Sequence, residues 1–170
     1  MIRPMLDALP DAPLPDGLLV RAAHAEQYRA IWEAIQEAFR DHWGSFPTTE
    51  WHYQQWLDDP NFDPALWRVA WDGDQIAGVT LGEIRAAENR QYHRARGWIE
   101  DVAVRRPWRR RGLARALIAQ TIRALQERGM TEAALDVDSE NLTGALGLYQ
   151  SLGFQVAKRF ATFRKLVRTT

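Results

Sequence analysis

The 170-residue chain contains no cysteine, and Lys158 and Lys165 are the lysines among its 22 basic residues. Without cysteine, the chain has no disulfide bond, no thiolate ligand for a metal ion and no cysteine nucleophile. No stretch approaches the roughly 20 consecutive apolar residues that a membrane-spanning helix needs. Residues 1–9, which include Arg3 and Asp7, lack the apolar core of a signal peptide. We therefore expect a soluble, cytoplasmic protein that does not bind a membrane.

The formal net charge is zero, but the charges are unevenly distributed along the chain. Acidic residues outnumber basic ones in residues 1–84, whereas basic residues dominate residues 85–128. A ligand with several phosphate charges would be drawn to the basic segment, and an amine to the acidic one. The length suits one domain with its own hydrophobic core. We expect that domain to cover residues 18–170, after an irregular, proline-rich lead-in over residues 1–17.

The spacing of apolar residues predicts alternating strands and helices. The predicted strands cover residues 18–23, 66–71, 75–85, 98–105 and 133–137. The predicted helices cover residues 26–41, 49–57, 112–128 and 143–152. Asp72-Gly73-Asp74 predicts a hairpin turn, residues 88–96 a polar hairpin tip, and residues 154–167 a terminal hairpin. This order predicts an α/β protein in which helices pack on a mixed sheet.

Residues 109–114, Arg-Arg-Arg-Gly-Leu-Ala, lie between a predicted strand and a predicted helix. Gly112 would let a ligand approach the backbone N–H groups that the start of a helix leaves unpaired. Together with the helix dipole and the arginines, those donors favour a phosphate group, although a solvated basic surface is the alternative. No Lys-Ser/Thr pair follows the glycine, so the pattern is not that of a P-loop NTPase, and no G-x-G-x-x-G is present.

Arg109, Gly112 and Ala114 occupy the marked places of the pattern Q/R-x-x-G-x-G/A. This pattern resembles the coenzyme A pyrophosphate signature of the GNAT N-acetyltransferase superfamily. Residues 136–154, D-V-D-S-E-N-L-T-G-A-L-G-L-Y-Q-S-L-G-F, resemble the second recurrent segment of that superfamily. The order of predicted elements is also similar, so the resemblance extends over nearly all of residues 18–167. In particular, the chain is similar to the C-terminal domain of tandem GNAT proteins such as mycothiol synthase.

The resemblance implies a GNAT fold, whose central twisted sheet is mostly antiparallel, has six to seven strands and is flanked by about four helices. It implies an acetyl-CoA-dependent N-acetyltransferase that transfers the acetyl group directly to a primary amine, with no covalent enzyme intermediate. Backbone groups implied to bind the pantetheine arm belong to Val102, Ala103 and Val104. Those implied to hold the pyrophosphate belong to Arg109, Arg110, Arg111, Gly112, Leu113 and Ala114. Asn141 is implied to contact the cofactor arm.

Two groups are candidates for proton transfer. The resemblance implies that Tyr149 protonates the departing thiolate, a step that suits a phenol because it is neutral at pH 7. Glu100 and Asp101 interrupt an apolar strand, where carboxylates are costly unless they are hydrogen-bonded or used. Strand alternation predicts Glu100 beside Trp98 and Val102, and Asp101 on the opposite face beside Ile99 and Ala103.

We predict Glu100 as the catalytic base that accepts a proton from the acceptor amine, since burial would raise its pKa. Other GNAT proteins have a glutamate base where Trp98 stands here, and structural pairing of Glu100 is the alternative. His42, His52 and His93 are further candidate bases, and their spacing predicts no metal site.

The implied partner is a small-molecule or peptide amine, and the aromatic residues between Phe39 and Trp56 would help to shape its pocket. GNAT proteins often dimerise through terminal strands, so a homodimer is a further expectation. Two alternatives remain: a non-catalytic module that binds or senses acyl-CoA, and a nucleic-acid-binding domain that uses residues 105–115. The arginines of that segment are not interleaved with aromatic residues other than Trp108, so we expect no nucleic acid partner.

Overall fold

The computed structural model describes residues 1–40, 47–138 and 144–161. Its centre is a six-stranded sheet with the order β1-β6-β5-β4-β3-β2. The strands are β1 (Ile2–Arg3), β2 (Leu19–Arg21), β3 (Arg68–Asp72), β4 (Gln75–Glu83), β5 (Arg96–Val104) and β6 (Glu132–Ala134). All neighbouring strands are antiparallel except β5 and β6, which are parallel. The predicted mixed, mostly antiparallel sheet is therefore confirmed.

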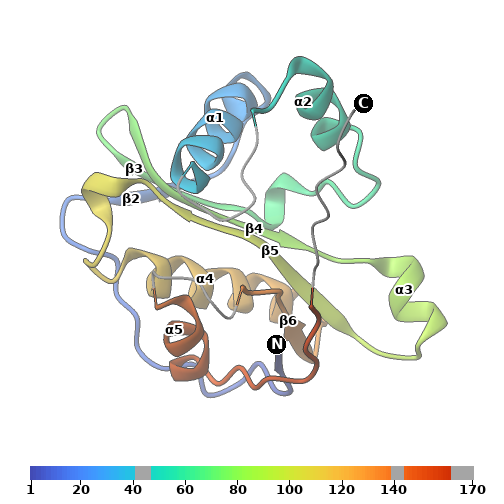
Figure 1. Ribbon diagram of the computed structural model, residues 1–170. Helices are drawn as coiled ribbons and strands as arrows, with labels where there is room; N and C mark the ends of the chain where they lie inside the picture. Colours follow the sequence, from blue (N-terminus) through green and yellow to red (C-terminus); the bar gives the residue numbers. More distant parts are fainter. Residues whose placement is uncertain (41–46, 139–143, 162–170) are drawn as a thin grey trace, which may run out of the picture.

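Helices cover both faces of this sheet. They are α1 (Tyr28–Phe39), α2 (Glu50–Leu57), α3 (Ala86–Gln91), α4 (Leu113–Glu127) and α5 (Ala145–Ser151). α1 and α2 lie on one face, α4 and α5 lie on the other, and α3 projects from one end (Figure 1). The four predicted helices are confirmed within a few residues at each end.

α3 stands where the sequence predicted only a polar hairpin tip. The side chain of Asn89 closes this excursion: its amide donates to the carbonyl of Arg96 (2.9 Å), and its carbonyl accepts from the Arg96 N–H (3.1 Å). Glu88 and Arg94 form an ion pair across the same segment. Contacts between α3 and the start of β5 thus accompany a short helix in place of part of the expected polar hairpin tip.

The amino-terminal segment differs from the predicted irregular lead-in, because Ile2 and Arg3 form the edge strand β1. Ile2 pairs with Ala134 of β6, and its backbone also bonds to Gln155. Leu6 is buried at 3% exposure. The rest of this segment, residues 4–17, contains no helix or strand, as predicted.

The predicted terminal hairpin over residues 154–167 is not formed in its described part, where Gln155 makes only an isolated bridge to Ile2. Residues 162–167 lie outside the described residues.

The hydrophobic core is divided by the sheet. Ile31, Ala34 and Ile35 of α1 pack on Val69 and other apolar side chains of one face. On the other face, the apolar stripe of α4 packs against the sheet and α5. Its fully buried members include Ala116, Leu117, Ile118, Ala119, Ile122 and Leu125. α4 is thus a rigid support whose N-terminus lies next to the end of β5.

Gly82 is where β4 passes closest to its neighbours. A Cβ atom there would lie 2.8 Å from the carbonyl oxygen of Leu66 and 2.9 Å from Cγ2 of Thr121. We expect Gly82→Ala to lower the free energy of unfolding by about 1–3 kcal/mol, because backbone and a buried helix must shift. Gly147→Ala is the control, since a Cβ at this helical position meets nothing within 4 Å. It should stabilise by up to about 1 kcal/mol in urea unfolding. Equal effects of the two changes would contradict this packing.

Candidate active site

One side of β5 is left open by β6. The two strands pair only over Arg96–Trp98 and Glu132–Ala134, whereas the pairing of β5 with β4 continues to Val104. Beyond Trp98, no described strand pairs with β5 on its β6 side. The backbone of this stretch can therefore bind an extended ligand in the way that a further strand would.

The backbone N–H and C=O groups of Val102, Ala103 and Val104 do not all point to the same side of β5. The N–H of Arg105 bonds to Ala77 (3.1 Å), and opposite residues in an antiparallel pair alternate between bonded and non-bonded. Ala103, opposite Val79, therefore directs its N–H and C=O toward β4, and is not free to bind a ligand through them. Val102 and Val104 direct theirs to the open side.

The loop after β5 leads to the N-terminus of α4. Arg110 and Gly112 have left-handed φ angles of 61° and 86°, and this pair of turns brings the chain into the helix. A Cβ atom at Gly112 would meet nothing within 4 Å, so space lies over the first turn. Within the helix, Leu113 and Ala114 have no acceptors for their N–H groups. This end of α4 can accept an anionic group.

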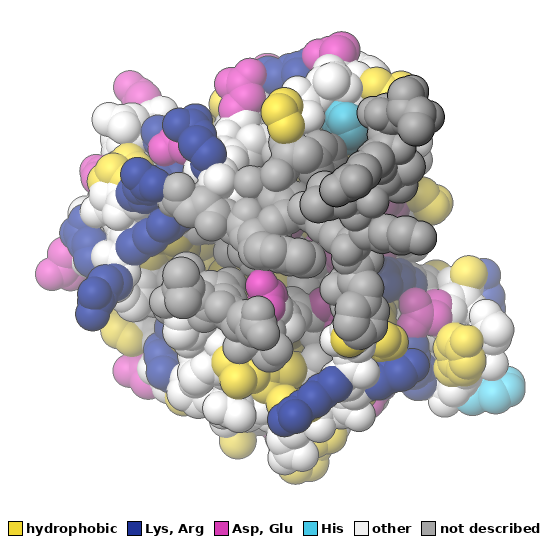
Figure 2. All heavy atoms as spheres, viewed as in Figure 1, with side chains coloured by type: hydrophobic (Ala, Val, Ile, Leu, Met, Phe, Trp, Pro, Cys, Tyr) yellow, Lys and Arg dark blue, Asp and Glu magenta, His cyan; other side chains and the backbone are white. Residues whose placement is uncertain are grey.

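The arginines of this loop have different surroundings. Arg109 donates to the carbonyl of Val104 (2.9 Å) and to that of Ala38 near the end of α1 (2.8 Å). Arg105 pairs with Glu37. The Arg110 and Arg111 side chains are exposed. Lys and Arg side chains gather at the edge where Figure 1 places this loop (Figure 2). Arg109 thus holds the loop in place, while the next two arginines face solvent.

A β-bulge changes the predicted orientation of the β5 side chains. The register between β4 and β5 shifts between Thr80 and Gly82. As a result, Ile99 and Val102 pack in the same hydrophobic cluster, while Ala103 belongs to the cluster on the α1 face. The prediction that Ile99 shares a face with Ala103 is wrong, because strict alternation ignores the extra residue of a bulge.

Glu100 lies at this bulge with its side chain 38% exposed and forms an ion pair with Arg85. Burial raises the pKa of Glu100 to about 7, the positive charge of Arg85 opposes that rise, and the negative charges of Glu83, Asp101 and Asp136 add to it. A carboxylate that titrates near neutral pH can accept and release a proton under physiological conditions.

Asp101 and Tyr149 come together from β5 and α5. Burial raises the pKa of Asp101 to about 6. Burial and the negative charge of Asp101 raise the pKa of Tyr149 to about 12. Tyr149 is 8% exposed and packs edge-on against Phe154, with 6.1 Å between ring centroids. Its phenol is therefore protonated at neutral pH and can donate a proton.

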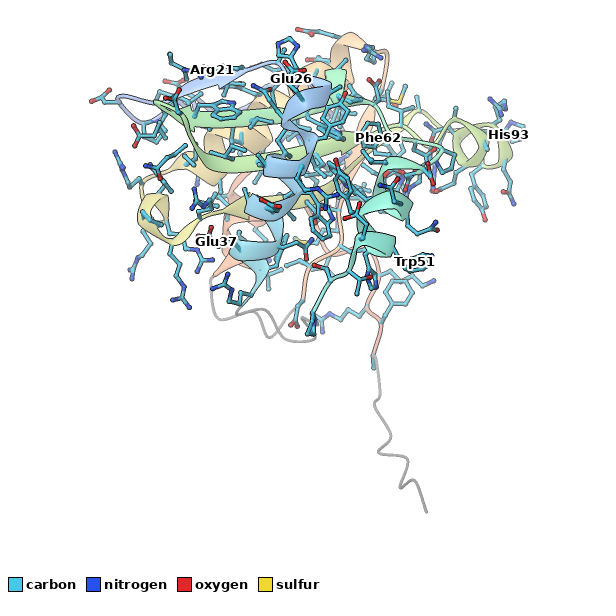
Figure 3. The ribbon with its side chains drawn as sticks, turned by 90° about the horizontal axis from the view of Figure 1, so that it is seen from above. Arg21, Glu26, Glu37, Trp51, Phe62 and His93 are labelled. Carbon is cyan, nitrogen blue, oxygen red and sulfur yellow. The ribbon has the colours of Figure 1, made fainter. Side chains whose placement is uncertain are left out.

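The histidines that the sequence suggested as alternative bases have other surroundings where they are described. The Nδ1 atom of His52 accepts from the backbone N–H of Thr49 (3.0 Å), which makes it part of the cap of α2. His93 lies on the end of the molecule that projects with α3, at the opposite end from the labelled Glu37 (Figure 3). His42 and Asn141 lie outside the described residues, so the contact predicted for Asn141 remains a prediction.

Most of the described aromatic residues near α1 and α2 pack on one another. Trp56 stacks on Trp67 with 5.1 Å between ring centroids, and Tyr53 contacts Trp32 at 5.5 Å. Trp51 is 64% exposed. Packing therefore explains the positions of the buried and half-buried rings, whereas the ring of Trp51 is mostly exposed to solvent.

Arg85 is the residue at this site that sequence reasoning missed. It follows β4 and contacts Glu83, Glu100 and the ring of Trp98. The pairing of β4 with β5 brings Arg85 to Glu100 and Trp98, so no local pattern indicates these two contacts. The signal available in the sequence was the pair of unexplained carboxylates in β5, each of which needs a partner.

In the described part of the chain, no cluster of three or more His, Cys, Asp or Glu side chains is arranged to hold a metal ion. None of the described helices combines the length and the apolar character needed to cross a membrane.

The site thus combines the open edge of β5, the start of α4 beyond the end of that strand and the buried side chain of Tyr149. Residues 28–154 match the Acetyltransferase (GNAT) family, and the chain belongs to this family of N-acetyltransferases.

Among its relatives is the mycothiol acetyltransferase of Renibacterium salmoninarum, which is 35% identical over 158 residues, or 90% of this chain and 46% of that protein. The chain thus spans about half the length of this curated relative. A GCN5-related N-acetyltransferase from Sphaerobacter thermophilus is similar in structure, with a TM-score of 0.68 and 37% identity over 89% of this chain and 46% of that one. The NatC complex bound to Gag peptide and CoA has a TM-score of 0.65 and 26% identity, over 84% and 87% of the respective chains.

The raised pKa of Asp101 predicts a pH-dependent stability. Its folded-state pKa of about 6 lies above its ordinary value of 3.8, so the folded state binds the proton more tightly than the unfolded state. This contribution is fully present below pH 4 and is lost as the pH rises through 6, by about 3 kcal/mol. We expect Asp101→Asn to remove this loss in urea unfolding measured between pH 4 and pH 8.

Asp74→Asn, in the exposed turn between β3 and β4, is the matched control and should keep the wild-type pH dependence. A wild-type profile that persists in Asp101→Asn would show that the carboxyl of Asp101 is not shielded from solvent.

Proposed function

We propose that this chain is an acetyl-CoA-dependent N-acetyltransferase that transfers the acetyl group directly to a primary amine. The observation that carries the proposal is the continuity of the open backbone of β5 with the N-terminus of α4. An extended amide-containing arm with a pyrophosphate at one end matches this arrangement in shape, hydrogen bonding and charge. Tyr149 and the carboxylates of β5 would lie toward the acyl end of such an arm.

The described residues fit the cofactor. The open-side backbone groups of Val102, and the N–H of Val104, would bind the pantetheine arm. The first-turn N–H groups of α4 would hold the pyrophosphate, with Arg110 and Arg111 adding positive charge. Ala103 would contribute packing rather than backbone hydrogen bonds. When bound, acetyl-CoA supplies an activated thioester carbonyl that an amine can attack.

Proton transfer would be divided between two residues. Glu100 would take a proton from the ammonium form of the acceptor, directly or through water, and so produce the nucleophilic amine. Tyr149 would give its proton to the departing thiolate sulfur of CoA. The raised pKa values of both groups support these roles, since Glu100 titrates near pH 7 and Tyr149 stays protonated there.

The acceptor would be a small-molecule or peptide amine. Negative charges near the site, on Glu83, Glu100, Asp101 and Asp136, would favour a protonated amine as it approaches. Both kinds of acceptor have support, because one relative is named for mycothiol and another structure contains a peptide. A cytoplasmic location and a homodimer stay predictions of the sequence.

Gly112→Asp tests the pyrophosphate site. The substitution places a side chain and a negative charge over the first turn of α4, where the wild type leaves open space. We expect calorimetric titration with acetyl-CoA to show saturable binding to the wild type and at least tenfold weaker binding to the variant. ATP and a short duplex DNA are titrated separately for comparison, and we expect both to bind more weakly than acetyl-CoA.

Gly129→Asp is the control for this titration. Gly129 has a similar φ of 81° and open space for a Cβ, but follows the opposite end of α4. The Gly129→Asp variant should bind acetyl-CoA with the affinity of the wild type. Undiminished affinity in Gly112→Asp would place the pyrophosphate elsewhere, and binding of DNA alone would favour the nucleic-acid alternative.

Tyr149→Phe separates catalysis from binding. The variant removes the proton donor but keeps the buried ring, so acetyl-CoA should bind normally while kcat falls by about 10²-fold or more. Release of free CoA would be followed with glucosamine, an aminoglycoside and a short peptide as acceptors. Unchanged turnover would exclude Tyr149 as the acid. Cofactor binding without turnover in the wild type would favour the sensing alternative.

A further inference from the structure

Arg85 is held by three groups at the edge of the candidate site. Its Nε atom donates to Oε1 of Glu83 at 2.6 Å, and its guanidinium carbon lies 4.3 Å from the centre of the Trp98 ring. Its Nη2 atom donates to Oε1 of Glu100. Glu83 and Trp98 are direct partners in the pairing of β4 with β5. The sheet itself therefore sets the position of two of the three partners.

The partners differ in how firmly they are fixed. The Glu83 side chain is 12% exposed, whereas that of Glu100 is 38% exposed. A guanidinium group is planar, so binding Glu83 through Nε and stacking on Trp98 also fixes the direction of Nη2. Arg85 is thus oriented before it meets Glu100, and Glu100 is the partner that can move.

We propose that Arg85, oriented by Glu83 and the Trp98 ring, is a positioning residue that holds the Glu100 carboxylate ready to accept the proton of the acceptor amine. This proposal rests on the proposed function, because it assigns Arg85 a part in the same reaction. Arg85 would bind one oxygen of Glu100 and leave the second oxygen free for the amine or a bridging water.

The charges around Glu100 explain why a cation is needed there. Negative charges act on Glu100 from three elements: Glu83 on β4, Asp101 on β5 and Asp136 after β6. Arg85 is the positive charge that opposes them. Without Arg85, the charges of the described residues that act on Glu100 would all be negative, so its carboxyl group would hold its proton at neutral pH and could not act as a base.

Two nearby arginines, Arg94 and Arg96, have other partners. Arg94 pairs with Glu88, whose second carboxylate oxygen lies 3.8 Å from Arg85. Arg96 pairs with Glu132. The negative charge of Asp59 also acts on Arg85. These pairings leave Arg85 as the described arginine that bonds to Glu100.

A direct titration of Glu100 tests the proposal without using activity. The protein would be labelled with ¹³C at the glutamate carboxyl carbons, and Glu100→Gln would identify the Glu100 signal. We expect Arg85→Met to raise the pKa of Glu100 by about one unit, as loss of an adjacent opposite charge does. Arg85→Lys should restore part of the shift, because it keeps the charge but loses the planar fork.

Arg128→Met is the control, since Arg128 also forms an ion pair with a carboxylate, that of Asp63, but lies outside the site. It should leave the titration of Glu100 unchanged. An identical pKa of Glu100 in the wild type and Arg85→Met would overturn the proposal.

The pH dependence of kcat connects this titration to the reaction. The profile is measured with the amine that is acetylated fastest among those tested. In Arg85→Met, the acidic limb of the kcat–pH profile should move up by about one pH unit, as the pKa of Glu100 does. The rate would fall about fivefold at pH 7 and recover by pH 9, while the KM for acetyl-CoA stays unchanged. A loss of kcat that is equal at every pH would mark Arg85 as merely structural.

The two proposals fail in different ways. A shift in the Glu100 titration without acetyl transfer by the wild type would overturn the proposed function, although Arg85 would still control Glu100. Acetyl transfer with no shift in that titration would overturn the role of Arg85 alone.

Discussion

The parallel pairing between β5 and β6 covers three residues of each strand, while β5 continues beside β4 to Val104. The candidate site depends on this early separation. It leaves backbone groups of Val102 and Val104 without a described strand partner, next to the start of α4. Unpaired backbone groups are costly in a protein interior. An extended ligand that formed the same hydrogen bonds as a neighbouring strand would replace the missing pairing. β5 itself is held in place by its pairing with β4 and by its packing against α4.

Charge imposes a second constraint on this region. Two carboxylates interrupt a strand in the middle of the sheet, and burial makes the ionised form of each unfavourable. Arg85 offsets part of this cost at Glu100, whereas Asp101 is shielded beside Tyr149. The resulting pKa values differ in the direction that the proposed proton transfer requires, because Glu100 titrates near neutral pH and the phenol of Tyr149 keeps its proton there. Stability and function thus place opposing demands on the same strand.

Regular elements with strong periodicity were predictable from sequence. α4 follows from apolar residues at helical spacing between Gly112 and Gly129, and the β3–β4 hairpin follows from Asp72-Gly73-Asp74. Elements that depend on distant partners were not. β1 forms because Ile2 meets Ala134, and α3 forms because Asn89 bonds to the backbone of Arg96. Neither contact leaves a local pattern in the chain.

The candidate site shows the same division. By itself, the sequence determined that residues 109–114 lead into a helix, that Tyr149 lies within a second segment similar to that of GNAT proteins and that Glu100 and Asp101 interrupt a strand. Such features depend on near neighbours in the chain, which the sequence contains in full. Only the tertiary structure decided that a bulge reorients the side chains of β5, that Ala103 turns its backbone to β4 and that Arg85 reaches Glu100. These depend on the register between strands, which is set by the packing of the whole sheet rather than by local spacing.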